Sequence, residues 1–164
     1  MEETIFTRMT QFLEKQDTLY HLSRNDLLAG HGITELHVLQ RIGKTESITV
    51  TELAKALHLT KGAVSKTVKK LAGQGYIRPY MREGNRQKIY FHLTDAGQEL
   101  FEAHEEQDRI WLERNRRFLR GLSPAERENA ADYLRRYNDY LEEEIRRMTP
   151  PNGDGEPTEP DGSA

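Results

Sequence analysis

Two closely spaced helix N-caps, followed by a hairpin pattern, constrain the fold of this chain most. Thr49 and Glu52 have the T-x-x-E spacing of a capping box, which predicts a short helix. Thr60 is placed to cap a second helix over residues 61–74, and Gly75 suits the end of that helix. The pattern predicts two short helices joined by a tight turn.

Two runs rich in Tyr, Ile and Phe follow, over residues 76–81 and 88–93, and they are typical of strands. The polar residues 82–87 between them include Gly84 and Asn85, which favour the positive φ of a hairpin tip. Two short helices followed in the sequence by a basic hairpin indicate a winged helix-turn-helix.

The helical spacing of the apolar residues predicts which face of each short helix is buried. The expected inward residues are Leu53, Ala54, Leu57, Val64, Val68 and Leu71. That packing leaves Lys61, Gly62, Ser65, Lys66 and Lys69 on the outer face of the second helix. His58 occupies the turn between the helices, where we expect it to adopt positive φ.

Charge is distributed unevenly along the chain, although its net value is only -3. Residues 60–93 carry eight Lys or Arg against one Glu, a net charge of +7. Residues 149–164 carry four acidic residues and no Lys or Arg, and they have too little apolar content to fold. The concentrated positive charge indicates a polyanionic partner.

The flanking sequence is predominantly helical. Helices are predicted over residues 3–22, 34–43 (capped by Thr34), 94–120 and 124–148, with a loop over residues 24–32. A capping box at Ser123 and Glu126 precedes the last of them. The expected fold class is therefore mainly α with a small β-hairpin wing.

Composition and missing motifs exclude several classes of function. The 164 residues contain no Cys, so disulfides, thiolate catalysis and Cys-based zinc sites are excluded. No apolar run is long enough to span a membrane, the N-terminus lacks the apolar core of a signal peptide, and we expect a cytoplasmic protein. No G-x-S-x-G, H-E-x-x-H or phosphate-binding glycine loop occurs. The sequence predicts neither an enzyme nor a cofactor.

Several short motifs fall in the order and spacing of a known family. They are Thr51-Glu52-Leu53-Ala54, Val64-Ser65-Lys66, Leu71 with Gly75-Tyr76-Ile77, and Leu93-Thr94 with Gly97. With them the chain resembles the MarR-type regulators, the multiple-antibiotic-resistance repressor family, over roughly residues 3–148. The resemblance implies an obligate homodimer held by the terminal helices, which binds double-stranded DNA at a pseudo-palindromic operator and is released by a small effector.

Four segments follow from this organisation. They are a dimerisation helix and loop (residues 1–33), the winged helix-turn-helix (34–93), two further dimerisation helices (94–148) and an acidic tail (149–164). The resemblance further implies that Lys61–Lys70 form the recognition helix and that the wing tip enters the minor groove.

The candidate DNA-contacting residues lie on the second short helix and on the wing. They are Thr60, Lys61, Gly62, Ser65, Lys66, Lys69, Lys70, Arg82, Asn85, Arg86 and Lys88. The family's wing usually carries an Asp-x-Arg pair, whereas this chain has Asn85 and Gln87 at those positions. Because minor-groove recognition needs a cation rather than a fixed position, Arg86 or Arg82 is expected to supply it.

Polar residues interrupt the apolar stripe of the long helix that begins near residue 94. Three hypotheses account for them: a hydrogen-bonded polar patch, a pocket for an organic effector, or a metal site. The candidate effector residues are Tyr20, His37, His104 and Trp111, and the alternative metal ligands are His21, His37, His104 and Asp108. A winged helix that contacts proteins instead of DNA is the rival to the regulator hypothesis as a whole.

Overall fold

A computed structural model describes residues 1–23 and 25–148, apart from the side chains of Asn85 and Arg86. The chain divides into two compact units, Met1–Glu113 and Arg114–Ala164. The predicted acidic tail, residues 149–164, lies outside the described residues.

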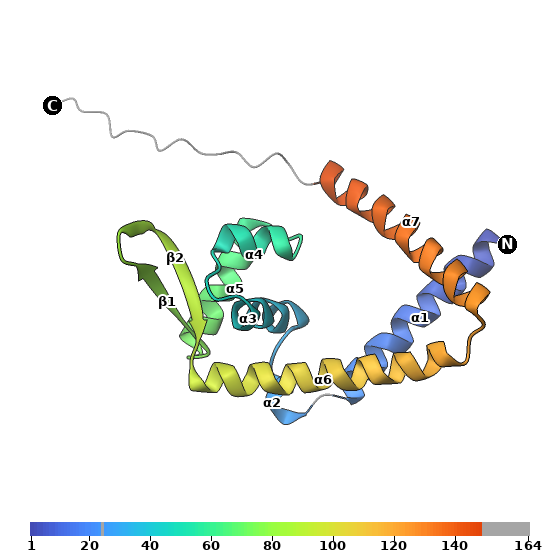
Figure 1. The fold of residues 1–164 in the computed structure, drawn as a ribbon, viewed down its shortest axis with the longest axis horizontal. Helices are drawn as coiled ribbons and strands as arrows, with labels where there is room; N and C mark the ends of the chain where they lie inside the picture. Colours follow the sequence, from blue (N-terminus) through green and yellow to red (C-terminus); the bar gives the residue numbers. More distant parts are fainter. Residues whose placement is uncertain (24, 149–164) are drawn as a thin grey trace. The chain divides into compact units, whose positions relative to one another are not determined.

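The described residues are mainly helical, with one two-stranded antiparallel sheet (Figure 1). The elements in chain order are α1 (Glu2–Leu22), α2 (Asp26–Ala29), α3 (Ile33–Lys44), α4 (Val50–Ala56), α5 (Lys61–Gly73), β1 (Ile77–Arg82), β2 (Asn85–Leu93), α6 (Asp95–Arg120) and α7 (Pro124–Met148). The predicted fold class, mainly α with a β-hairpin wing, is confirmed.

The predicted helix boundaries at the two short helices are confirmed in detail. The Thr49 backbone N–H donates to the Glu52 carboxylate at 2.8 Å, and the Glu52 N–H donates back to the Thr49 hydroxyl at 3.3 Å. The Thr60 hydroxyl accepts from the Ala63 N–H at 3.1 Å. His58 lies in the turn with φ of 52°, as expected.

The segment predicted as a loop over residues 24–32 contains a short helix, so that prediction is wrong in part. The Asn25 side chain accepts from the Leu28 N–H at 3.0 Å and thereby caps α2. Leu28 is buried, which anchors this single turn on the core. α3 then begins at Ile33 with Gly32 as its N-cap, two residues ahead of the predicted cap at Thr34.

The wing has a shorter tip than predicted. β2 begins at Asn85 rather than near residue 88, so the turn consists of Glu83 and Gly84. Gly84 has φ of 80°, a conformation that a side chain disfavours.

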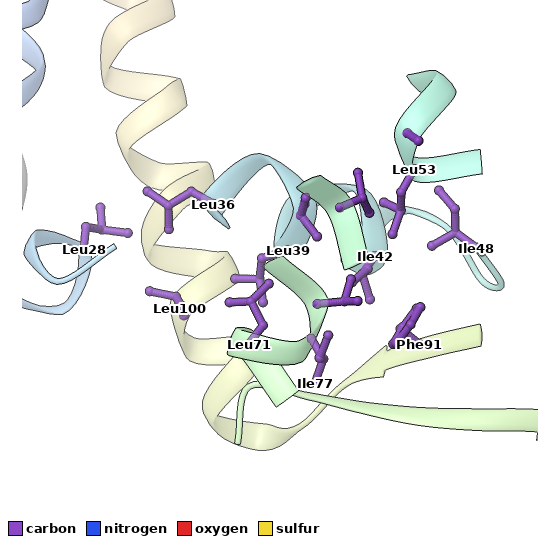
Figure 2. Close-up of a cluster of buried hydrophobic side chains, with 14 residues drawn as sticks. Leu28, Leu36, Leu39, Ile42, Ile48, Leu53, Leu71, Ile77, Phe91 and Leu100 are labelled. Carbon is purple, nitrogen blue, oxygen red and sulfur yellow. The ribbon is translucent and has the colours of Figure 1, made fainter. Parts of the chain in front are cut away.

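The apolar core lies among α3, α4, α5 and the wing (Figure 2). All the predicted inward residues of the two short helices are buried except Leu57, which is partly buried and packs against the cluster. Leu28 of α2 and Leu100 of α6 complete it. Burial of these side chains orients α5, because one face of that helix is committed to the core.

α6 starts in close contact with the backbone that leads into the wing. The Thr94 N–H donates to the Tyr76 carbonyl at 3.0 Å, and the Thr94 hydroxyl donates to the Gly75 carbonyl at 2.6 Å. A Cβ on Gly97 would lie 1.9 Å from the Tyr76 carbonyl oxygen. A glycine at 97 is therefore required for α6 to approach the wing this closely.

None of the helices in the described ranges combines the length and the apolar content needed to cross a bilayer.

Candidate nucleic-acid interface

The outer face of α5 presents the residues that the sequence predicts for DNA contact. Val64, Val68 and Leu71 are buried in the core. The opposite face is exposed, with Ser65 partly buried, and carries Thr60, Lys61, Gly62, Ser65, Lys66 and Lys69. Among the described residues, no atom beyond the helix lies closer than 4.0 Å to a Cβ placed on Gly62, so the first turn of α5 has room for an approaching backbone or base. The arrangement matches a helix that enters a major groove.

Lys70 is placed differently from its neighbours, because it forms an ion pair with Glu35 of α3. His31, which is buried, lies with its Nδ1 3.3 Å from the other Glu35 oxygen. Partial burial would raise the pKa of Glu35, but the hydrogen bonds from Lys70 and His31 outweigh it and hold the pKa below its ordinary value. Lys70 therefore joins α5 to α3 in this structure.

The wing is an antiparallel pair with an irregularity near its tip. Tyr80 pairs with Tyr90, and Arg82 pairs with Asn85, so the register shifts between these two pairs. Lys88 lies on β2 and is exposed. The side chains of Asn85 and Arg86, both predicted to contact DNA, lie outside the described residues.

Arg82, the remaining wing candidate, is exposed yet bound to another segment of the chain. One of its guanidinium nitrogens donates to the Ser47 hydroxyl in the loop between α3 and α4. The guanidinium also lies over the Tyr90 ring, 5.1 Å from the centroid.

Glu35, Ser47 and Tyr80 contribute to this interface, although the sequence did not predict it. Glu35 contacts Lys70, and Ser47 contacts Arg82, in each case across 35 positions of the chain. Tyr80 lies on the wing itself and contacts Ser47, 33 positions earlier. Local periodicity carries no signal for such contacts.

A separate groove of about 470 Å³ lies between α1 and α6, and none of its lining residues belongs to α5. It is lined by Phe12, Gln16, Asp17, Tyr20, Ile33 and Trp111. Two of the four predicted effector residues, Tyr20 and Trp111, thus share one groove. The buried Gln107 side chain joins α6 to the end of α1 beside this groove. Its amide nitrogen lies 3.4 Å from the Tyr20 carbonyl and 3.3 Å from the Ser23 hydroxyl.

The other two predicted effector residues form a pair of their own. The rings of His37 and His104 lie 5.8 Å apart, and neither residue lines the groove. His104 is buried, and within the described chain neither of its ring nitrogens has a hydrogen-bond partner. Burial disfavours the charged imidazolium and lowers the pKa of His104, despite the attraction of Asp108.

The alternative metal ligands His21, His37, His104 and Asp108 are not grouped as a metal site within the described residues. His21 lies on exposed α1 and contacts Asp17, one turn away, at 3.4 Å. Across residues 1–23 and 25–148, no three His, Asp or Glu side chains are grouped so as to hold a metal ion. Asp108 instead accepts a 2.7 Å hydrogen bond from Gln40, whose amide nitrogen also donates to Glu105 at 2.6 Å.

Comparisons with known proteins agree on one family. A family model described as the MarR family matches residues 33–89. The regulator PchR of Bacillus subtilis strain 168, described as an HTH-type transcriptional regulator, is 30% identical over 118 residues, which cover 72% of this chain and 70% of PchR. YhjH of the same organism, described as an uncharacterized HTH-type transcriptional regulator, is 39% identical over 72 residues, which cover 44% of this chain and only 41% of YhjH.

A solved structure supports the same fold. The crystal structure of Streptococcus pneumoniae FabT in complex with DNA has a TM-score of 0.74 and 23% sequence identity, and the match covers 87% of this chain and 99% of FabT.

Proposed function

The chain belongs to the MarR family of transcriptional regulators, and on this premise we propose that it is a homodimeric repressor that binds a pseudo-palindromic operator. Members of this family are DNA-binding regulators of transcription rather than enzymes. The operator would be read by α5 in the major groove, with the wing beside it, and we place this activity in the cytoplasm, where bacterial DNA is found.

The observation that carries the proposal is the exposed basic face of α5. Burial of Val64 and Val68 turns Lys61, Lys66 and Lys69 outward together, and no acidic residue lies within α5. Long cationic side chains at these positions reach guanine acceptors or phosphates when the helix enters a major groove. FabT, which has the same fold, was crystallised with DNA.

The terminal helices support the dimer. In the described chain neither α1 nor α7 contains a buried residue, and both expose large apolar side chains. Phe12 and Leu13 of α1, and Leu134 and Met148 of α7, are all more than half exposed. Apolar surface on this scale marks an interface, and a second copy would also set two α5 helices about one DNA turn, ~34 Å, apart.

A selection from a randomised duplex library with the full-length protein tests DNA binding. We expect an enriched pseudo-palindrome, bound with a steep salt dependence. For ~6–10 phosphate contacts, affinity should fall by roughly 10³–10⁵ between 50 and 200 mM salt. Lys66→Ala should weaken binding, whereas Lys15→Ala, which removes an exposed cation from α1, should leave it unchanged. No enriched sequence, or binding that ignores salt, would favour a protein-interaction module instead.

We further propose that an organic effector binds the groove between α1 and α6. Its lining is largely apolar, from Phe12, Tyr20, Ile33 and Trp111, with Asp17 as its only carboxylate. This chemistry favours a neutral or cationic apolar molecule over an anion. α1 belongs to the proposed dimer interface, so a ligand there shifts DNA affinity by its differential affinity for two arrangements of the dimer.

Nile red, a neutral apolar dye, is a suitable probe of the groove. We expect its emission to rise on binding and Trp111 fluorescence to change, with both signals reduced by Tyr20→Ala. His37→Ala changes the neighbouring histidine pair and serves as the matched control outside the groove. Dye binding that survives Tyr20→Ala, or a response to zinc chloride in place of the dye, would contradict this assignment.

A further inference from the structure

The wing is held to the loop between α3 and α4 at the point where its own backbone pairing is interrupted. The strand ladder shifts register between Tyr80 and Arg82, so β-pairing alone does not fix the tip relative to the base of the wing. Side chains from both residues instead reach the loop residues Glu46 and Ser47.

The hydrogen bonds at this junction form a chain with one consistent direction. The Arg82 guanidinium only donates, and it donates to the Ser47 hydroxyl. The Tyr80 hydroxyl lies 2.8 Å from the Ser47 oxygen and 3.1 Å from the Glu46 carbonyl, which only accepts. Tyr80 therefore donates to Glu46 and accepts from Ser47, so the hydroxyl hydrogens of both Tyr80 and Ser47 have acceptors.

Aromatic contacts hold the same residues from the other side. The Tyr80 ring lies 5.6 Å from the Tyr90 ring and 5.2 Å from the His92 ring. The Arg82 guanidinium lies over Tyr90, which is buried, at 5.1 Å from its centroid. To enter a minor groove, Arg82 would have to leave both the Tyr90 face and the Ser47 hydroxyl.

We propose that Arg82 is a positioning residue, which acts through Ser47 and Tyr80 to fix the angle of the wing against the loop between α3 and α4. This inference rests on the proposed DNA-binding function and refines it. Arg82 contributes to operator affinity by orienting the wing, and Lys88, together with Arg86 as predicted from the sequence, supplies its DNA-contacting charge.

The salt dependence of operator binding separates a positioning residue from a phosphate contact. Loss of one phosphate contact makes the negative slope of log K against log salt shallower by about 0.9, and this is what a lowered slope means below. Loss of orientation instead weakens binding and leaves the slope unchanged. We expect Ser47→Ala, Tyr80→Phe and Arg82→Ala each to weaken binding roughly three- to tenfold with an unchanged slope. Lys88→Ala, the matched contact variant, should lower the slope.

A double variant tests whether the residues act together. Ser47→Ala with Arg82→Ala should bind no more weakly than the weaker single variant, and Ser47→Thr, which keeps the hydroxyl, should bind like the parent. Amide hydrogen exchange of residues 78–90 in the free protein should accelerate in Ser47→Ala and remain unchanged in Lys88→Ala.

Different results overturn different statements. If Arg82→Ala lowers the salt slope while Ser47→Ala binds like the parent and its wing exchanges normally, Arg82 contacts DNA directly and the inference is wrong. If instead neither Lys66→Ala nor Lys88→Ala changes the affinity for DNA, α5 and the wing do not contact an operator and the proposed function itself fails. Accelerated exchange in Ser47→Ala would still support the attachment of the wing in that case.

Discussion

The winged-helix lobe, residues 33–93, and the last helix, α7, both contain many charged residues but use them differently. In the lobe, charged side chains join segments that are far apart in the chain, as Glu35 does with Lys70. In α7 every recorded ion pair links residues three or four apart, such as Arg135 and Asp132 at 2.5 Å. The first kind fixes tertiary structure, while the second stabilises only a single helix.

Apolar residues show the same contrast. Leu36, Leu39 and Leu53 in the lobe are fully buried, whereas Phe12 of α1 and Leu134 of α7 are more than half exposed. A helix with an apolar stripe gains most of its stability by burying that stripe. The lobe buries its apolar residues within one chain, whereas the terminal helices need a further surface, such as a second copy of the chain, to bury theirs.

The largest expected effect comes from removing the terminal helix that needs a partner. A chain that ends at Gly121 should be monomeric or aggregated in sedimentation velocity at micromolar concentration, where the full chain should be a dimer. Operator affinity should fall by about 10² or more, because the second half-site becomes a separate binding event. A monomeric full-length chain would remove the basis of the contrast between lobe and terminal helices.

A single methyl group at Gly97 should have the next largest effect. Gly97→Ala places a Cβ 1.9 Å from the Tyr76 carbonyl oxygen, so α6 must move away from the wing. We expect a loss of about 3 kcal/mol in the free energy of unfolding by urea. Gly73→Ala is the matched control, because within the described residues nothing beyond its own helix and neighbours lies within 4 Å of a Cβ there, so it should not destabilise the protein. Equal stabilities for the two variants would contradict the close approach.

The ion pair between Glu35 and Lys70 should have a smaller, pH-dependent effect. Because the pKa of Glu35 is lowered on folding, its contribution is complete above the ordinary carboxyl pKa, about 4.3, and is lost as pH falls through the lower folded-state pKa. Glu35→Gln should cost about 1 kcal/mol at neutral pH and nothing in strong acid.

Asp132→Asn in α7 sharpens the same comparison. Its pair with Arg135 lies within one exposed helix turn, so the variant should unfold like the parent at neutral pH. If it costs as much as Glu35→Gln, the distinction between local and long-range ion pairs does not hold for this protein.

Deletion of residues 149–164 should have the smallest effect. Their composition of Gly, Pro and acidic residues predicts no contribution to folding, and they lie outside the described residues. We expect an unchanged melting temperature and a slight increase in operator affinity, since the deletion removes four negative charges that repel DNA. A large fall in the melting temperature would show that this segment packs on the body.

The sequence alone determined the local architecture, because caps and helix faces depend on neighbours a few residues apart. Thr49 and Thr60 cap their helices as predicted, and the inward residues of α4 and α5 were identified from spacing. The one-turn helix α2 was missed, since its stability comes from burial of Leu28 rather than from its own pattern.

Only the tertiary structure distinguished among cations that look alike in the sequence. Lys69 and Lys70 are neighbours, but successive residues point about 100° apart around a helix, and the packing of α5 on α3 turns Lys70 toward Glu35. Arg82 likewise resembles any wing cation until Ser47, 35 positions earlier, is placed beside it. Such assignments depend on the distance between elements that are remote in the chain, which is set by the packing of the shared core.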